Sequence, residues 1–229
     1  MTLQTLLLDV GDTLVRERPS RFEIYAAAAR ARGVEIDARG MAERMRAAHE
    51  GLPRTLDGNF RYTDPWFEAF IRRIFGDDLG LSKAGVDALV PELFARFESP
   101  DTFEPYPGAR ELLAAARERG LTLGIVSNWS ARLDRVLAAV GLEGAFDFVL
   151  CSALEGVEKP DPEIFRRALA RAGGAPEATL HAGDHLRNDV EPAQGLGIRA
   201  VLVDHRGRFE GQDLPCPRVS GLDGLRAML

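Results

Sequence analysis

Five short apolar runs occur in this 229-residue chain, and the first is far from the other four. The first covers residues 3–10, and residues 15–104 contain no comparable run. The other four lie at 121–127, 146–151, 179–182 and 200–203. A short apolar run that ends in glycine or polar residues is typical of a strand buried on both faces. Alternation of such runs with helical patterns favours a parallel sheet between helices.

Helix signals differ between the two parts of the chain. After residue 105, they mark segments 108–119, 130–140 with Ser130 as candidate N-cap, and 162–172 after Asp161. Within residues 15–104, apolar residues recur at helical spacing over 25–32, 38–49, 64–75 and 81–97. We therefore expect an α/β fold. Residues 1–14 and 105–229 form a Rossmann-like parallel sheet sandwiched by helices, and residues 15–104 form an all-helical insert.

Composition excludes several classes of protein. Twenty-nine basic against 35 acidic residues give a net charge of −6, which disfavours a nucleic-acid surface or a polybasic membrane anchor. The longest uncharged stretch, 120–131, has 12 residues, whereas about 20 are needed to span a bilayer. The first residues also lack a basic segment followed by an apolar run. We expect a cytoplasmic monomer or homodimer without nucleic-acid or membrane partners.

Polar side chains lie at or after the ends of four of the five expected strands. They are Asp9, the pair Ser127 and Asn128, Lys159 in the following loop, and Asp184 with Asp189 nearby. In an open parallel sheet, ligands bind at the carboxyl ends of the strands. Carboxylates, a hydroxyl and an ammonium that converge there would suit a divalent cation and a phosphate.

Lys159 is also notable because lysine is rare in this chain. Arginine occupies 27 of the 29 basic positions, and Lys83 is the other lysine. A compact ammonium suits a crowded pocket better than a planar guanidinium. This favours a specific need for lysine at position 159, although a salt bridge near a helix start is the alternative.

The polar segments resemble the four motifs of the haloacid dehalogenase-like hydrolase superfamily in both order and spacing. They are Asp9-Val10-Gly11-Asp12-Thr13-Leu14, Ser127-Asn128, Lys159-Pro160, and Gly183-Asp184 with Asn188-Asp189. The insert after the first motif is similar to the helical cap of subfamily I. The chain looks most like the branch that contains the haloacid dehalogenase-like hydrolase domain-containing proteins. This resemblance implies an Mg²⁺-dependent hydrolase of small phosphorylated metabolites.

The resemblance also implies a role for each residue. Asp9 would be the nucleophile that forms an aspartyl-phosphate, while Ser127, Asn128 and Lys159 would bind the phosphoryl group. The metal would be held by Asp9, the Gly11 carbonyl, Asp184 and Asp189, since Mg²⁺ prefers hard oxygen ligands. Gly183 is expected to let the backbone turn tightly. Taken singly, Ser127 and Asn128 also fit a turn or cap, and Asp189 also fits a helix N-terminus.

One position departs from the family pattern. The usual second aspartate of the first motif, which acts as general acid and base, is replaced by Gly11, and Asp12 lies one residue further on. General acid and base catalysis contributes about 10²- to 10⁴-fold, so we expect a slow phosphatase unless Asp12 or a residue of the helical cap substitutes.

Three alternatives remain open at this stage. The first is a non-catalytic phosphate-binding or regulatory module. The second is a haloacid dehalogenase, against which the metal-binding form of Gly183-Asp184 argues. The third is a phosphonoacetaldehyde hydrolase that forms a Schiff base on Lys83.

Overall fold

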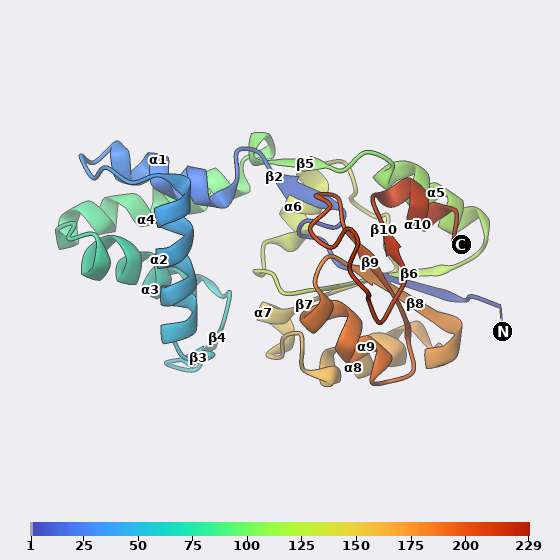
Figure 1. The fold of residues 1–229 in the computed structure, drawn as a ribbon. Helices are drawn as coiled ribbons and strands as arrows, with labels where there is room; N and C mark the ends of the chain where they lie inside the picture. The colour runs from blue at the N-terminus through green and yellow to red at the C-terminus, as the bar shows by residue number, and fades with distance from the viewer. Residues whose placement is uncertain (1) are drawn as a thin grey trace. The chain divides into compact units, whose positions relative to one another are not determined.

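The computed structural model describes residues 2–229 and divides into two compact units. The core unit combines the residues up to Arg16 with Glu104–Leu229, and the helical unit is Glu17–Phe103 (Figure 1). The chain thus passes between the units after residues 16 and 103, where the sequence predicts boundaries after residues 14 and 104. Strands β2 (Val15–Glu17) and β5 (Phe103–Pro105) pair with each other at these crossings. That the helical unit acts as a cap stays a prediction.

A six-stranded sheet forms the centre of the core unit, in the order β10-β9-β8-β1-β6-β7. All neighbouring strands are parallel. The strands are β1 (Thr5–Leu8), β6 (Thr122–Ser127), β7 (Phe148–Cys151), β8 (Thr179–Gly183), β9 (Arg199–Val203) and β10 (Arg218–Val219). The expected α/β fold is therefore confirmed. The sequence did not predict β10, which has only two residues.

Helices cover both faces of this sheet, with α8 and α9 on one face and α5 and α10 on the other (Figure 1). The helices of the core unit are α5 (Ala109–Glu118), α6 (Leu133–Ala139), α7 (Ser152–Glu155), α8 (Pro162–Ala172), α9 (Glu191–Gln194) and α10 (Leu222–Arg226). The predicted cap of α8 is present, since Asp161 accepts a hydrogen bond from the Glu163 N–H at 2.9 Å. The predicted start of α6 is wrong, because Ser130 caps only a turn through the Arg132 N–H.

The helical unit is built around its own apolar core. It contains α1 (Arg21–Arg30), α2 (Ala38–Gly51), α3 (Asp64–Arg72), a π-helical segment Arg73–Asp78, and α4 (Lys83–Glu98). Trp66 and Phe70 are buried there and stack with ring centroids 5.5 Å apart. In residues 2–229, no helix is both long enough and apolar enough to cross a bilayer.

The prediction of an all-helical insert is wrong in one detail. Strands β3 (Thr55–Leu56) and β4 (Asn59–Phe60) form a hairpin in the helical unit. Its turn residues, Asp57 and Gly58, have φ angles of 48° and 79°. An Asp-Gly pair accepts positive φ at both turn positions, which matches the twist of paired strands and favours a tight hairpin.

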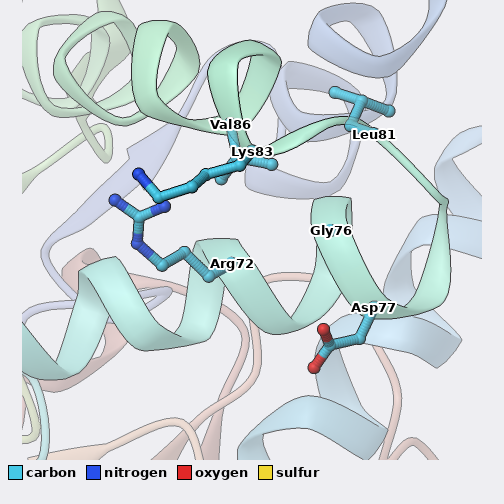
Figure 2. A pocket seen from close by; sticks show the side chains of 6 residues that line it. All are labelled: Arg72, Gly76, Asp77, Leu81, Lys83 and Val86. Atoms are coloured by element: carbon cyan, nitrogen blue, oxygen red, sulfur yellow. The ribbon is translucent and has the colours of Figure 1, made fainter.

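A pocket of about 310 Å³ lies in the helical unit, and Lys83 is on its rim (Figure 2). The Lys83 side chain is 83 % exposed, and its ammonium donates a hydrogen bond to Asp87 at 2.6 Å. Lysines that form Schiff bases are activated by desolvation or by a neighbouring cation. Arg72 binds the same carboxylate as Lys83, but the Lys83 ammonium is exposed to solvent and paired with Asp87. The absence of desolvation does not favour the phosphonoacetaldehyde hydrolase alternative.

Candidate active site

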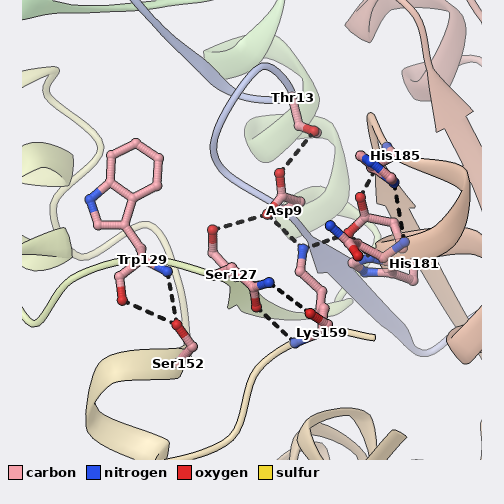
Figure 3. Close-up of polar contacts among 11 residues, drawn as sticks. Asp9, Thr13, Ser127, Trp129, Ser152, Lys159, His181 and His185 are labelled. Carbon is pink, nitrogen blue, oxygen red and sulfur yellow. Dashed lines mark hydrogen bonds and ion pairs between the residues drawn. The ribbon is translucent and has the colours of Figure 1, made fainter. Parts of the chain in front are cut away.

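Four side chains named from the sequence meet at the carboxyl edge of the sheet in the core unit. Asp9 follows β1, Ser127 ends β6, Lys159 lies in the loop before α8, and Asp184 follows β8. Strand β1 lies between β6 and β8, so Asp9 is flanked on both sides (Figure 3). The site is therefore formed where the strand order changes direction, which is the place where such sheets bind ligands.

Asp9 is held by three donors. Its Oδ1 accepts hydrogen bonds from Ser127 Oγ at 2.9 Å and from Lys159 Nζ at 2.7 Å. Its Oδ2 accepts one from Thr13 Oγ1 at 3.2 Å. Only 6 % of the residue is exposed. The carboxylate is thus fixed in position, and the bonds to Ser127 and Lys159 are ones that a phosphoryl oxygen can also accept.

Lys159 is buried between two carboxylates. Its ammonium donates to Asp9 and to Asp189 Oδ1, and the residue is only 3 % exposed. Burial alone would lower the pKa of Lys159, but the charges of Asp189 and Asp9 outweigh it and hold this pKa above its ordinary value. The group therefore stays cationic at neutral pH.

Asn128 holds the backbone of Lys159. The Asn128 amide donates to the Lys159 carbonyl and accepts from the Lys159 N–H, each at 2.8 Å. Both ends of the amide are used, so Asn128 acts as a positioning residue for Lys159. Direct contact of Asn128 with substrate stays a prediction.

Asp189 is only 1 % exposed and uses both of its oxygens. Oδ1 accepts from Lys159 and from His181 Nε2 at 3.1 Å, and Oδ2 accepts from the His185 N–H at 3.0 Å. Burial would raise the pKa of Asp189, but the charge of Lys159 and the hydrogen bond from His181 hold this pKa well below its usual range. Asp189 is therefore an anion that orients Lys159.

Gly183 is needed for space rather than for a turn. Its φ is not in the left-handed region, so the expected turn requirement is wrong. A Cβ at this position would lie 2.2 Å from Asp189 Cγ. Only glycine lets the Asp189 carboxylate approach the end of β8 this closely.

Asp184 completes a group of three carboxylates. Asp9, Asp184 and Asp189 each contribute one carboxylate oxygen, and these three oxygens lie within 4.8 Å of one another. Burial raises the pKa of Asp184 to about 7, and the charge of Asp9 adds to this effect, while the hydrogen bond from Arg208 opposes it. Crowded acidic oxygens of this kind fit a hard divalent cation such as Mg²⁺, which would offset their repulsion. Coordination by the Gly11 carbonyl stays a prediction.

Asp12 is bound elsewhere and does not belong to this group. Its Oδ1 accepts hydrogen bonds from Tyr106 Oη at 3.2 Å and from Arg206 Nη2 at 2.6 Å. Its φ of 54° places the backbone in the left-handed region, which aspartate tolerates better than most residues. The carboxylate that follows Gly11 is thus paired with Arg206.

An indole ring lies against Gly11. A Cβ at position 11 would be 3.1 Å from Cζ3 of Trp129. The Trp129 backbone is in turn held by Ser152 (Figure 3), whose Oγ accepts from the Trp129 N–H at 3.1 Å. The place of the missing second aspartate is therefore bordered by an aromatic side chain.

Sequence reasoning missed several residues of this site. Arg206 and Arg208 follow strand β9, whose carboxyl end lies at the same edge of the sheet, so the strand-end rule would have identified them. Thr13 lies inside the first motif, and His181 lies on β8 two residues before Gly183, so both were close to recognised signals.

The fold and site together define an α/β protein with an acidic, lysine-containing site at the carboxyl edge of a parallel sheet. A profile of the haloacid dehalogenase-like hydrolases matches residues 3–219, and the chain belongs to this family.

Named proteins from several organisms are similar to this chain. It is 33 % identical over 207 residues to a haloacid dehalogenase-like hydrolase domain-containing protein 3 of Bos taurus, covering 89 % of this chain and 82 % of that one. It is 33 % identical to a phosphoserine phosphatase of Thermus thermophilus, with 91 % of each chain covered. The crystal structure of an HAD phosphatase from Thermococcus onnurineus matches with a TM-score of 0.69 and 25 % identity, over 99 % of this chain and 97 % of that chain.

Proposed function

We propose that this chain is an Mg²⁺-dependent hydrolase of small phosphate monoesters that works through an aspartyl-phosphate on Asp9. The observation that carries the proposal is the Asp9 carboxylate itself. It is buried, held by Ser127 and Lys159, and within 4.8 Å of two further carboxylates. Relatives named as phosphatases support the same chemistry.

The first step is attack by a carboxylate oxygen of Asp9 on phosphorus. A P–O bond to Asp9 forms, and the P–O bond to the ester oxygen breaks, so the ester oxygen leaves with the electron pair, as an aryloxide or as an alkoxide that takes up a proton from water. Ser127 and Lys159 transfer their hydrogen bonds from Asp9 to phosphoryl oxygens, where charge accumulates. Bound Mg²⁺ would supply further neutralisation of that charge.

The second step is hydrolysis of the aspartyl-phosphate. Water attacks phosphorus and loses a proton to the solvent, the bond between phosphorus and the Asp9 oxygen breaks, and inorganic phosphate leaves with the Asp9 carboxylate restored. Asp189 keeps Lys159 oriented through both steps, and Asn128 fixes the Lys159 backbone.

Within the part of the chain that the structure describes, the site has no evident general acid that would donate a proton to the leaving group. Gly11 has no side chain, and Asp12 is engaged by Tyr106 and Arg206. We therefore propose slow turnover of alkyl phosphates and faster turnover of aryl phosphates. A nitrophenolate leaves without needing a proton, whereas an alkoxide needs one, and general acid catalysis accounts for about 10²- to 10⁴-fold.

Hydrolysis of p-nitrophenyl phosphate and of a panel of phosphorylated metabolites tests this proposal, with and without Mg²⁺. The control is Asp9→Asn, which keeps the size of the side chain but removes the nucleophile. Turnover that depends on Mg²⁺ and on Asp9 supports the proposal. Turnover no higher than that of Asp9→Asn on every ester would overturn it. Mg²⁺-dependent phosphate binding without hydrolysis would then favour the alternative of a binding or regulatory module.

A pair of substitutions tests the missing proton donor. Gly11→Asp alone must shift the indole, because the contact at Cβ is already as close as 3.1 Å. We expect a larger gain on alkyl phosphates when Gly11→Asp is combined with Trp129→Ala, with Trp129→Ala alone as control. If the double variant gains nothing over this control, proton donation does not limit the rate.

A further inference from the structure

The loop after strand β9 places two arginines against the acidic edge of the sheet. Arg206 Nη2 donates to Asp12, and Arg208 Nη2 donates to Asp184 Oδ2 at 2.8 Å. Gly207 lies between them with a φ of 67°, a backbone conformation that glycine adopts without strain. The loop therefore adds cationic groups to an edge that otherwise holds mostly carboxylates.

The backbone of this loop is anchored by a buried carboxylate. Asp204 is 1 % exposed and accepts hydrogen bonds from the N–H groups of Arg208 and Phe209, both at 2.9 Å. Arg218 donates to the same carboxylate at 3.0 Å. In contrast, the Arg208 side chain is 45 % exposed. Arg208 can therefore change the partner of its guanidinium while its backbone stays in place.

Asp184 is the group on which two interactions converge. Its carboxylate binds Arg208, and it also belongs to the cluster with Asp9 and Asp189 that fits a divalent cation. A carboxylate that coordinates a divalent cation has much less charge left to attract a guanidinium. Cation binding would therefore release Arg208 close to Asp9, where the phosphate of a substrate would be attacked.

We propose that Arg208 determines specificity: it pairs with Asp184 until a divalent cation binds there, and then binds a second anionic group of the substrate. The preferred substrates are phosphate monoesters that carry an additional carboxylate or phosphate, because a guanidinium binds both with paired hydrogen bonds. This inference rests on the proposed function.

The kinetic test compares two esters of similar size, 2-phosphoglycolate and 2-hydroxyethyl phosphate, which differ in the added charge. Arg208→Gln should lower the ratio of their kcat/KM values about tenfold, the factor expected for loss of one charge-assisted contact. Arg208→Lys keeps the charge and should restore part of the ratio. The matched control is Arg187→Gln, an exposed arginine in the neighbouring π-helical segment Leu186–Val190, which should leave the ratio unchanged. An equal loss on both esters, or no loss, would overturn the specificity role.

The second test measures Mg²⁺ affinity by calorimetry without substrate at pH 8. Arg208→Gln should bind Mg²⁺ about two- to fivefold more tightly, because a partly exposed ion pair no longer competes for Asp184. Arg187→Gln should match the wild type. Unchanged or weaker Mg²⁺ binding by Arg208→Gln would overturn the proposal that Arg208 and the cation exchange at Asp184.

The two tests separate this inference from the proposed function. If the wild type hydrolyses neither these two esters nor p-nitrophenyl phosphate faster than Asp9→Asn does, the proposed function fails. Calorimetric binding of the two esters in the presence of Mg²⁺ then replaces the kinetic ratio. The Mg²⁺ titration tests whether the cation replaces Arg208 at Asp184, whether or not the wild type hydrolyses the esters.

Discussion

Replacement of Asp184 by asparagine should make the metal-free protein more stable at pH 8. Burial, together with the charge of Asp9, raises the pKa of Asp184 from 3.8 to about 7 in the folded state. Between pH 3.8 and about pH 7, Asp184 has lost its proton in the unfolded chain but keeps it in the folded chain, so the free energy of unfolding falls as the pH rises towards 7. Asparagine stays neutral and avoids this loss.

The magnitude follows from the two pKa values. About 3 pH units separate them, at about 1.36 kcal/mol each, so the cost in the wild type is about 4 kcal/mol at pH 8. The side chain is 16 % exposed, so solvent screening is modest. The hydrogen bond from Arg208 needs no separate correction, because it already lowers this pKa. We expect a net gain of about 4 kcal/mol at pH 8 and less than half of that at pH 5.

Equilibrium urea unfolding in EDTA at both pH values measures this gain. The control is Asp213→Asn, an exposed aspartate, which should change stability by less than about 0.5 kcal/mol. Added Mg²⁺ should stabilise the wild type by about 2.7 kcal/mol when its concentration is 100 times the Kd for Mg²⁺. The Asp184→Asn variant should be stabilised much less. A variant no more stable than the wild type at pH 8, or equally stabilised at pH 5 and pH 8, would refute the reasoning.

Two further substitutions test the packing around the site. Lys159→Met leaves the carboxylates of Asp9 and Asp189 buried without their shared cation, so the free energy of unfolding should fall by about 3 kcal/mol in urea titrations at pH 7.5. An unchanged unfolding midpoint would mean that water reaches these carboxylates. Gly183→Ala forces a Cβ against Asp189 and should cost more than about 2 kcal/mol in the same assay. Gly51→Ala, where a Cβ meets nothing within 4 Å, should be neutral or slightly stabilising.

The strands were predictable where burial alone defines them. Strand β1 lies between two neighbours and is completely buried, so it is a continuous apolar run in the sequence. Strands β3, β4 and β10 have two residues each and exist because of their pairing partners. Periodicity cannot reveal such short elements, although the Asp57-Gly58 turn was a signal for the hairpin.

The site was predictable in its members but not in all of its contacts. Asp9, Ser127 and Asp184 could be placed because strand ends of a parallel sheet share one edge. The partners of Asp12 could not, since Tyr106 and Arg206 lie 94 and 194 residues further along the chain. The strand-end rule was applied to only four strands, so the arginines after the fifth strand were overlooked.

The contact between Trp129 and Gly11 links two positions that are far apart in the sequence. A side chain at position 11 and the indole at position 129 compete for the same space, so the effect of a change at one depends on the residue at the other. Such dependence is epistasis between the first motif and the residue that directly follows the second. Random mutagenesis that samples single substitutions would undervalue an acidic residue at position 11, and libraries that vary both positions together are the appropriate way to recover a faster enzyme from this chain.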